Sequence, residues 1–149
     1  MLKKDNLCNA INLALTETLE EMAFMETCQV EGDTTYLRNN NVEVLLKVTQ
    51  PISLKFILSM EIELLKEIAT NILAVDEDNL THNMQTDVIS EILNTISGKI
   101  MKKIIPKEQS FDLGIPTVNK NNYENQESFV TCNFGTVDHK KILFSVYTN

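Results

Sequence analysis

The stretch Asp87-Val88-Ile89-Ser90-Glu91-Ile92-Leu93-Asn94-Thr95-Ile96-Ser97-Gly98 lies within a long run of periodic apolar residues that ends at Pro106. Apolar residues recur through this run at spacings of three and four, which predicts one helix face turned to a core. They are Ile89, Leu93, Ile96, Ile100 and Ile104. At roughly 100° per residue, the opposite face carries Asp87, Glu91, Asn94 and Gly98. The sequence therefore predicts a carboxylate and a carboxamide side by side, one turn apart, on a surface that points away from the core.

Gly98 lies on this polar face, one turn beyond Asn94. A glycine inside a helix costs roughly 1 kcal/mol relative to alanine, so its presence needs a reason. One reason is that the backbone of a partner molecule comes close to the helix at this point.

Composition and charge limit the classes of function. The 149 residues are 43% hydrophobic, which suits a single domain spanning residues 1–149. The formal net charge is −8 and the pI is about 4.7. A phosphate backbone would be repelled by this charge, so we set nucleic-acid binding aside.

The cysteines and the apolar segments predict a cytoplasmic protein. Cys8, Cys28 and Cys132 are scattered and odd in number, which argues for a reducing compartment and against a disulfide framework or a zinc site. No signal-peptide core follows Lys3 and Lys4, and no apolar run approaches the ~18 residues that a membrane helix needs.

The remaining periodicities predict an α+β fold, with an antiparallel β-sheet and long α-helices packed on one face. We expect helices at residues 6–24, at 61–75, and from a start within 80–87 to 105. We expect strands at 26–30, 42–48 and 52–60, an edge segment at 111–118, and a closing hairpin of 129–134 and 142–147. We expect turns at 32–33 and 39–41 and a polar loop at 119–127. We see no linker and no second domain.

Two groups of residues outside the long helix are predicted to be buried. Met22-Ala23-Phe24-Met25 is more apolar than a surface helix requires, which indicates a buried helix end. Cys28 and Cys132 fall on predicted strands, where a thiol is more often part of the core than reactive.

The pattern Asp-x-x-x-Glu-x-x-Asn on the long helix, continued by Ile96-Ser97-Gly98, resembles the motif of the CheC/CheX phosphatases of bacterial chemotaxis. The segment 19–26, Leu-Glu-Glu-Met-Ala-Phe-Met-Glu, is similar to the first helix of CheX, and 113–116, Leu-Gly-Ile-Pro, also fits. The motif occurs once, which favours the CheX branch over the CheC branch with its two copies. The similarity spans nearly the whole domain.

The resemblance implies a phosphatase that hydrolyses the aspartyl phosphate of a CheY-type response regulator. It implies that Asn94 positions the attacking water and that Glu91 pairs with a lysine of the regulator. It implies a CheX-like homodimer formed through the sheets, for which the 111–118 segment and the C-terminal strands would supply an edge. We expect this chain to bind no cofactor and no metal, because the magnesium ion would belong to the phosphorylated regulator.

Asp87, Gly98 and Met101 are candidate partner-binding residues around this pair. Gly98 would let the partner approach, and Asp87 would border the contact unless it only caps the helix or is solvated. Met101 and Ile105 would add apolar contact, with packing against the C-terminal strands or another subunit as an equal alternative. For Glu91 and Asn94, the alternative is an ordinary solvated helix face.

Two other functions compete with catalysis. The first is a non-catalytic interaction module, because relatives of this fold serve as binding surfaces in the flagellar switch. The second is a small-ligand domain, which we rank last because the sequence has no glycine-rich phosphate loop.

Overall fold

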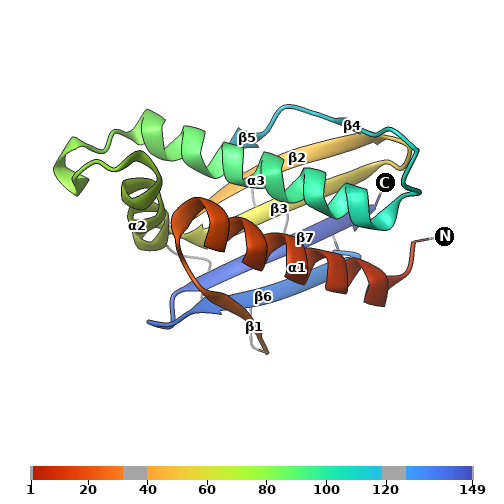
Figure 1. Cartoon of the computed structure of the whole chain (residues 1–149), viewed down its shortest axis with the longest axis horizontal. Coiled ribbons are helices and arrows are strands. Elements are labelled where there is room, and N and C mark those ends of the chain that lie inside the picture. The colour runs from red at the N-terminus through yellow and green to blue at the C-terminus, as the bar shows by residue number, and fades with distance from the viewer. Residues whose placement is uncertain (1, 32–39, 119–126, 149) are drawn as a thin grey trace.

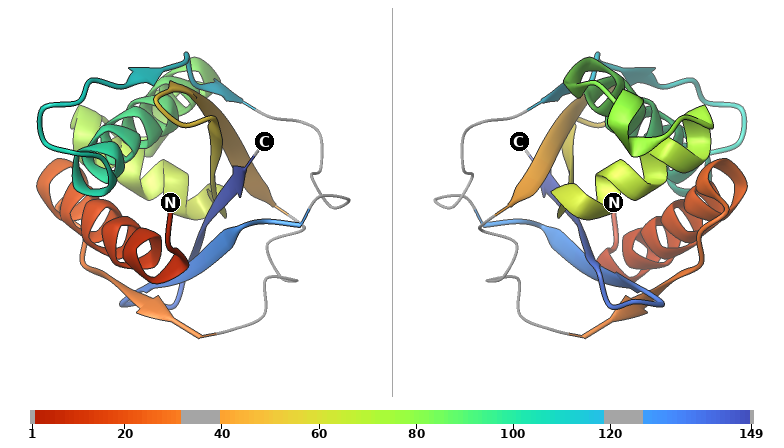
Figure 2. Two further views of the ribbon diagram at one scale, coloured as in Figure 1. Left: turned by 90° about the vertical axis from the view of Figure 1, so that its right-hand side faces the viewer. Right: turned by 90° about the vertical axis from the view of Figure 1, so that its left-hand side faces the viewer.

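Three helices pack on one face of a curved antiparallel sheet in the computed structural model, which describes residues 2–31, 40–118 and 127–148 (Figures 1 and 2). These three α-helices are α1 (Lys4–Ala23), α2 (Ile62–Leu73) and α3 (His82–Ile104), and a short 3₁₀ helix, η2 (Glu77–Asn79), precedes α3. The strands are β1 (Thr27–Val30), β2 (Asn41–Gln50), β3 (Leu54–Glu61), β4 (Asp112–Leu113), β5 (Thr117–Val118), β6 (Val130–Thr136) and β7 (Lys141–Thr148). The predicted α+β class and the placement of the helices on one face are confirmed.

The described strands form one seven-stranded sheet in the order β1-β6-β7-β3-β2-β4, with β5 also paired to β2. All the strand pairs are antiparallel. β2 and β3 form the predicted hairpin, in which Val44 lies opposite Leu58 and Leu46 opposite Phe56. The predicted edge segment is present as β4 and β5, two short strands beside β2.

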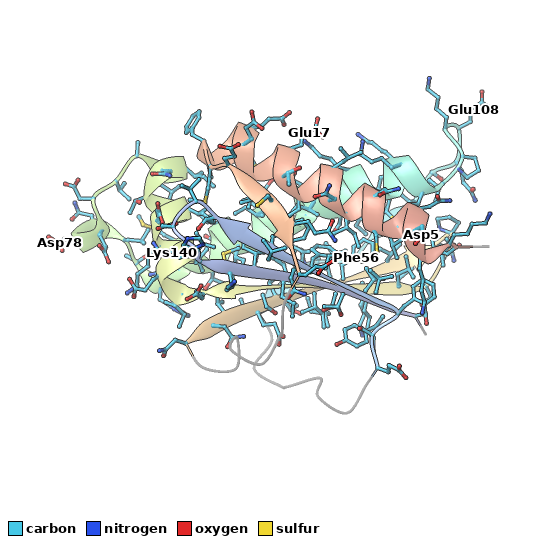
Figure 3. All side chains as sticks on the ribbon, turned by 90° about the horizontal axis from the view of Figure 1, so that it is seen from below. Asp5, Glu17, Phe56, Asp78, Glu108 and Lys140 are labelled. Atoms are coloured by element: carbon cyan, nitrogen blue, oxygen red, sulfur yellow. The ribbon has the colours of Figure 1, made fainter. Side chains whose placement is uncertain are left out.

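The core lies between the sheet and the helices. Period-two alternation in β2, β3, β6 and β7 directs one set of apolar side chains toward the helices, and these side chains are buried. Phe56 and Phe144 are fully buried from neighbouring strands, with ring centroids 5.7 Å apart. Figure 3 shows Phe56 in the interior, whereas Glu17 and Asp78 project outward. Burial of this apolar surface is the main favourable term in folding.

The prediction of a buried end for α1 is only partly right. Ala23 and Met25 are buried and Met22 is half-buried, but Phe24 is 82% exposed. The reason is that α1 ends at Ala23 and Phe24 takes a left-handed conformation (φ 56°), so its side chain leaves the apolar stripe of the helix.

The cysteines also differ from one another. Cys28 is exposed on the edge strand β1, so the prediction of a core position is wrong for it. Cys132 is buried as expected, with its Sγ 3.9 Å from that of Cys8. Burial, and secondarily the neighbouring Cys8 thiol, raises the pKa of the Cys132 thiol to about 12.

None of the helices in the described parts of the chain is both long and apolar enough to cross a membrane. The predicted turn at 32–33 and most of the predicted loop at 119–127 lie outside the described residues. Asn41 of the predicted turn at 39–41 is the first residue of β2.

A Leu93→Ala substitution tests the packing of α3. Leu93 is completely buried, so its truncation leaves a cavity, and we expect the free energy of unfolding to fall by about 2–5 kcal/mol. The matched control is Leu13→Ala, the same change at a leucine of α1 that is 53% exposed, which should stay within about 0.5 kcal/mol of wild type. Denaturant unfolding monitored by circular dichroism measures both. Equal losses in the two variants would contradict the observed packing.

Candidate functional site

The long helix α3 carries the candidate site, and its start is fixed by a side-chain cap. The Met84 N–H donates to Oγ1 of Thr81 at 3.1 Å, which satisfies one of the free amides of the first turn. Lys102 and Lys103 lie in the last turn, where positive charge is favourable next to the helix dipole. Pro106 follows directly after the cap residue Ile105.

Burial sets the rotation of α3 about its axis. Ile89, Leu93, Ile96 and Ile100 have no exposed surface, which confirms the predicted core face, while Ile104 is only half-buried. The buried face is wider than predicted. It also contains Val88, Ile92, Ser97 and Met101. α3 packs against α1, α2 and the strands β2 and β3, so its opposite side is the one left to solvent.

Glu91 and Asn94 lie on this open side. Both are exposed, and three residues along a helix place them on the same face, about 4.5 Å apart along the axis. Within residues 2–31, 40–118 and 127–148, no hydrogen bond or ion pair engages the side chain of either residue. The main-chain oxygen of Glu91 does accept a hydrogen bond from Thr95 Oγ1 at 2.9 Å, which leaves the carboxylate free. The structure thus presents a free carboxylate and a free carboxamide together.

Asp87 is exposed one turn before Glu91, as expected for a residue that borders a contact. It does not cap the helix, because Thr81 does. The chain has no lysine or arginine between Lys66 and Lys99, so no cation on α3 lies near these two carboxylates.

Lys99 is the first cation after Glu91, and it is engaged with α1. Its Nζ lies 3.0 Å from Glu21 Oε2 and 3.8 Å from Glu17 Oε2. Partly exposed pairs of this kind contribute up to about 1 kcal/mol, so their main effect here is to hold α1 and α3 in register and to occupy the lysine. No pattern within one stretch of sequence predicts this pairing, because the two helices are distant in the chain.

Gly98 is half-buried, and packing within the fold does not require it. A Cβ at this position would meet nothing within 4 Å. Its φ is not positive either, so neither steric crowding nor backbone conformation explains the glycine. The structure is therefore compatible with the predicted explanation, in which the backbone of a partner molecule comes close to α3 at Gly98.

The prediction that Met101 contacts a partner is wrong, because its side chain is completely buried in the core cluster. The helical angle does place it below Asn94 and Gly98, but α3 also contacts α1, β4 and β5, and this turn of the helix is enclosed. Ile105 is buried as well, so both residues pack inside the chain. The main contacts of α3 are with α1, α2 and the strands β2 to β5, and not with the C-terminal strands that the alternative named.

A family model described as chemotaxis phosphatase CheX matches residues 42–137, which is more than half of the chain and includes Glu91 and Asn94. This chain belongs to the CheX family. A comparison with curated proteins finds no match.

Solved structures of CheX proteins share the fold. The CheX structure from Vibrio vulnificus is similar with a TM-score of 0.78 and 17% identity over 99% of both chains. CheX in the CheX-CheY-BeF3-Mg complex from Borrelia burgdorferi has a TM-score of 0.73 and 18% identity over 95% of this chain and 96% of that one. FliY from Thermotoga maritima has a TM-score of 0.65 and 13% identity over 97% of this chain and 89% of that one. At these identities the likeness shows the fold, and the roles of individual residues depend on the geometry above.

A Gly98→Ala substitution tests whether the fold itself needs this glycine. Because alanine has the higher helix propensity and its Cβ meets open space, we expect the free energy of unfolding to rise by about 0.5–1 kcal/mol. The matched control is Gly114→Ala, whose Cβ would lie 3.1 Å from the Lys47 main-chain oxygen and should lower stability. Chemical denaturation measures both. A loss of stability in Gly98→Ala would assign the glycine to packing.

Proposed function

We propose that this CheX-family protein hydrolyses the aspartyl phosphate of a CheY-type response regulator, with Asn94 and Glu91 of α3 as the residues that act on it. The observation that carries the proposal is the exposure of both side chains, without a partner among the described residues, on the face of α3 that the core leaves open. The family supports the general role of a chemotaxis phosphatase. The solved Borrelia burgdorferi complex of CheX with CheY supports a regulator of this type as the partner.

Asn94 is proposed to hold the attacking water. An aspartyl phosphate is an acyl phosphate, and its hydrolysis requires a water molecule in line with the bond between phosphorus and the aspartate oxygen. The water oxygen bonds to phosphorus as that bond breaks, which releases the aspartate carboxylate and inorganic phosphate. A carboxamide oxygen accepts a hydrogen bond from the water, and the NH₂ group donates to an oxygen nearby. The contribution of Asn94 is therefore positioning.

Glu91 is proposed to pair with a lysine of the regulator and so fix the docking register. Its carboxylate has no cation partner among the described residues, and a charge-assisted hydrogen bond to a lysine ammonium would satisfy it. Magnesium, when bound, would be held by the regulator and would neutralise phosphate oxygens. No residue of this chain is assigned to it.

The non-catalytic interaction module remains the second candidate, because an exposed carboxylate and carboxamide on one helix face can bind a partner without acting on it. Binding of a phosphorylated regulator without faster loss of phosphate would indicate that function. The expected homodimer also stays a prediction, with β4 and β5 beside the edge of the sheet where a second copy would add. The expectation that the C-terminal strands supply an edge is wrong, because β6 lies between β1 and β7, and β7 lies between β6 and β3.

Asn94→Ala tests the water-positioning role. We expect the maximal rate of phosphate loss from the regulator to fall about 100-fold or more, with little change in binding, because only the positioning group is removed. Release of ³²P from the labelled regulator measures the rate. The matched control is Asn9→Ala, the same change at an exposed asparagine of α1, which should behave as wild type. A near-normal rate in Asn94→Ala would refute the mechanism.

Glu91→Gln and Glu91→Lys test the docking role. Loss of the charge should raise the Kd for the activated regulator about tenfold, and reversal of the charge should raise it further. The Kd of the wild type should rise with salt, and that of Glu91→Gln should rise less, because one ion pair is missing. Isothermal titration at two salt concentrations measures this, with Glu20→Gln, an exposed glutamate of α1, as the control. An unchanged Kd in both Glu91 variants would remove the proposed ion pair.

A further inference from the structure

An apolar hollow of about 330 Å³ lies beside the candidate site, where the ends of α1 and α2 meet the first half of α3. Five apolar side chains and two carboxylates line it. They are Met22 from α1, Ile72 and Leu73 from α2, and Met84, Asp87, Val88 and Glu91 from α3. The hollow therefore shares Glu91 and Asp87 with the site of the proposed reaction.

Apolar side chains are unusually exposed around this hollow. Of the six large apolar residues that are exposed in the described parts of the chain, Leu73 and Met84 line the hollow, and Phe24 follows the lining residue Met22 by two positions. The end of α1 is held beside α2, because the main-chain oxygen of Ala23 accepts a hydrogen bond from Asn71 Nδ2 at 3.1 Å, and Asn71 immediately precedes Ile72. Such a concentration of exposed apolar side chains is typical of a protein contact.

Phe24 provides a second, independent indication. It occupies the left-handed position after α1, with φ 56°, and its side chain is 82% exposed. Glycine is the favoured residue at this position, and a bulky side chain there is strained. The fold gains little from packing an aromatic ring that is exposed, so a contact outside the chain accounts better for the residue.

The charges around the hollow indicate what binds there. Among the described residues, Asp87 and Glu91 are the only charged ones that line it, and the chain has no lysine or arginine from residue 67 to residue 98. A second copy of this chain, with a net charge of −8, would bring more negative charge to these carboxylates. A partner that presents an apolar side chain next to a lysine or arginine matches the apolar walls of the hollow and the negative charge of Asp87 and Glu91. Met22 and Met84 are flexible enough to adapt to its shape.

We propose that this hollow receives an apolar side chain of the phosphorylated regulator, flanked by a basic residue, and thereby supplies affinity for the regulator on the helix that carries Asn94. This inference rests on the proposed function. From Met84 to Asn94 the helix rises about 15 Å, so one face of a small protein can contact the hollow and Asn94 together. A buried apolar anchor beside a satisfied ion pair is the usual arrangement of a binding hot spot.

The proposal can be tested by substitutions that make the hollow polar. Leu73→Gln and Met84→Gln alter exposed side chains of similar size without changing charge, so the fold should persist, as circular dichroism and the melting temperature will show. For the double variant we expect the Kd for the beryllofluoride-activated regulator and the KM for the phosphorylated one to rise tenfold or more, with kcat within twofold of wild type. The matched control is Val137→Gln, at a residue that is 80% exposed outside the hollow, and it should leave all three unchanged.

Phe24→Gly separates docking from stability. The melting temperature should stay the same or rise, because glycine adopts the left-handed conformation without strain, while the Kd for the activated regulator should increase at least threefold. Unchanged Kd values in this variant and in the double variant would overturn the proposal. A change in oligomeric state by light scattering with an unchanged Kd would also overturn it, in favour of a second copy.

The same measurements distinguish failure of this inference from failure of the proposed function. Wild-type turnover that depends on Asn94, together with unaltered Kd and KM in the hollow variants, rejects the hollow alone. A wild-type protein that neither binds nor dephosphorylates a regulator rejects both proposals.

Discussion

The burial of one face of α3 is the constraint on which the rest of the structure depends. Ile89, Leu93, Ile96 and Ile100 have no exposed surface, so the helix cannot rotate without bringing apolar side chains into water. Because a helix has a fixed angle per residue, this burial also determines where Glu91 and Asn94 point. No contact of these two side chains with the rest of the described chain is needed to orient them. The core positions the site, and the site remains free for another molecule.

Most of the fold follows from periodicity. The spacing of three and four in α3 and the alternation in β2 and β3 predicted elements that the structure confirms, as well as the exposure of Glu91 and Asn94. The errors come from effects that a single segment does not show. Phe24 was assigned to the core because its neighbours are apolar, but the chain turns out of the helix there. Met101 has the right helical angle for the open face, but other elements enclose its turn. The apolar hollow is formed by the ends of α1 and α2 and the first half of α3, so no single stretch of sequence predicts it.

Three features of this region lower the stability of the isolated chain. Gly98 weakens the helix where a larger residue would fit. Phe24 holds a left-handed conformation that favours glycine, and Asp87 and Glu91 lie together without a cation from their own helix. Natural sequences depart from local rules most often at functional sites. Asp87, Glu91 and Gly98 lie along α3, and Phe24 follows the lining residue Met22 of the hollow by two positions. Their common location favours a single protein-binding surface over unrelated irregularities.

The position of Glu91 raises an electrostatic question for the proposed reaction. A carboxylate one helix turn from a bound phosphoryl group repels it by about 3 kcal/mol for each pair of unit charges at ~5 Å and an effective dielectric constant of ~20. This repulsion would oppose docking unless a cation lies between the two anions. A regulator lysine that bonds both Glu91 and the phosphoryl group would turn the repulsion into two attractions, whereas a phosphorylated protein without a lysine at that point would be rejected. The neutral carboxamide of Asn94 adds no such penalty and can approach the phosphorus closely. Under the proposed function, Glu91 would select the partner and Asn94 would serve the reaction, which would account for an acid and an amide being placed one turn apart.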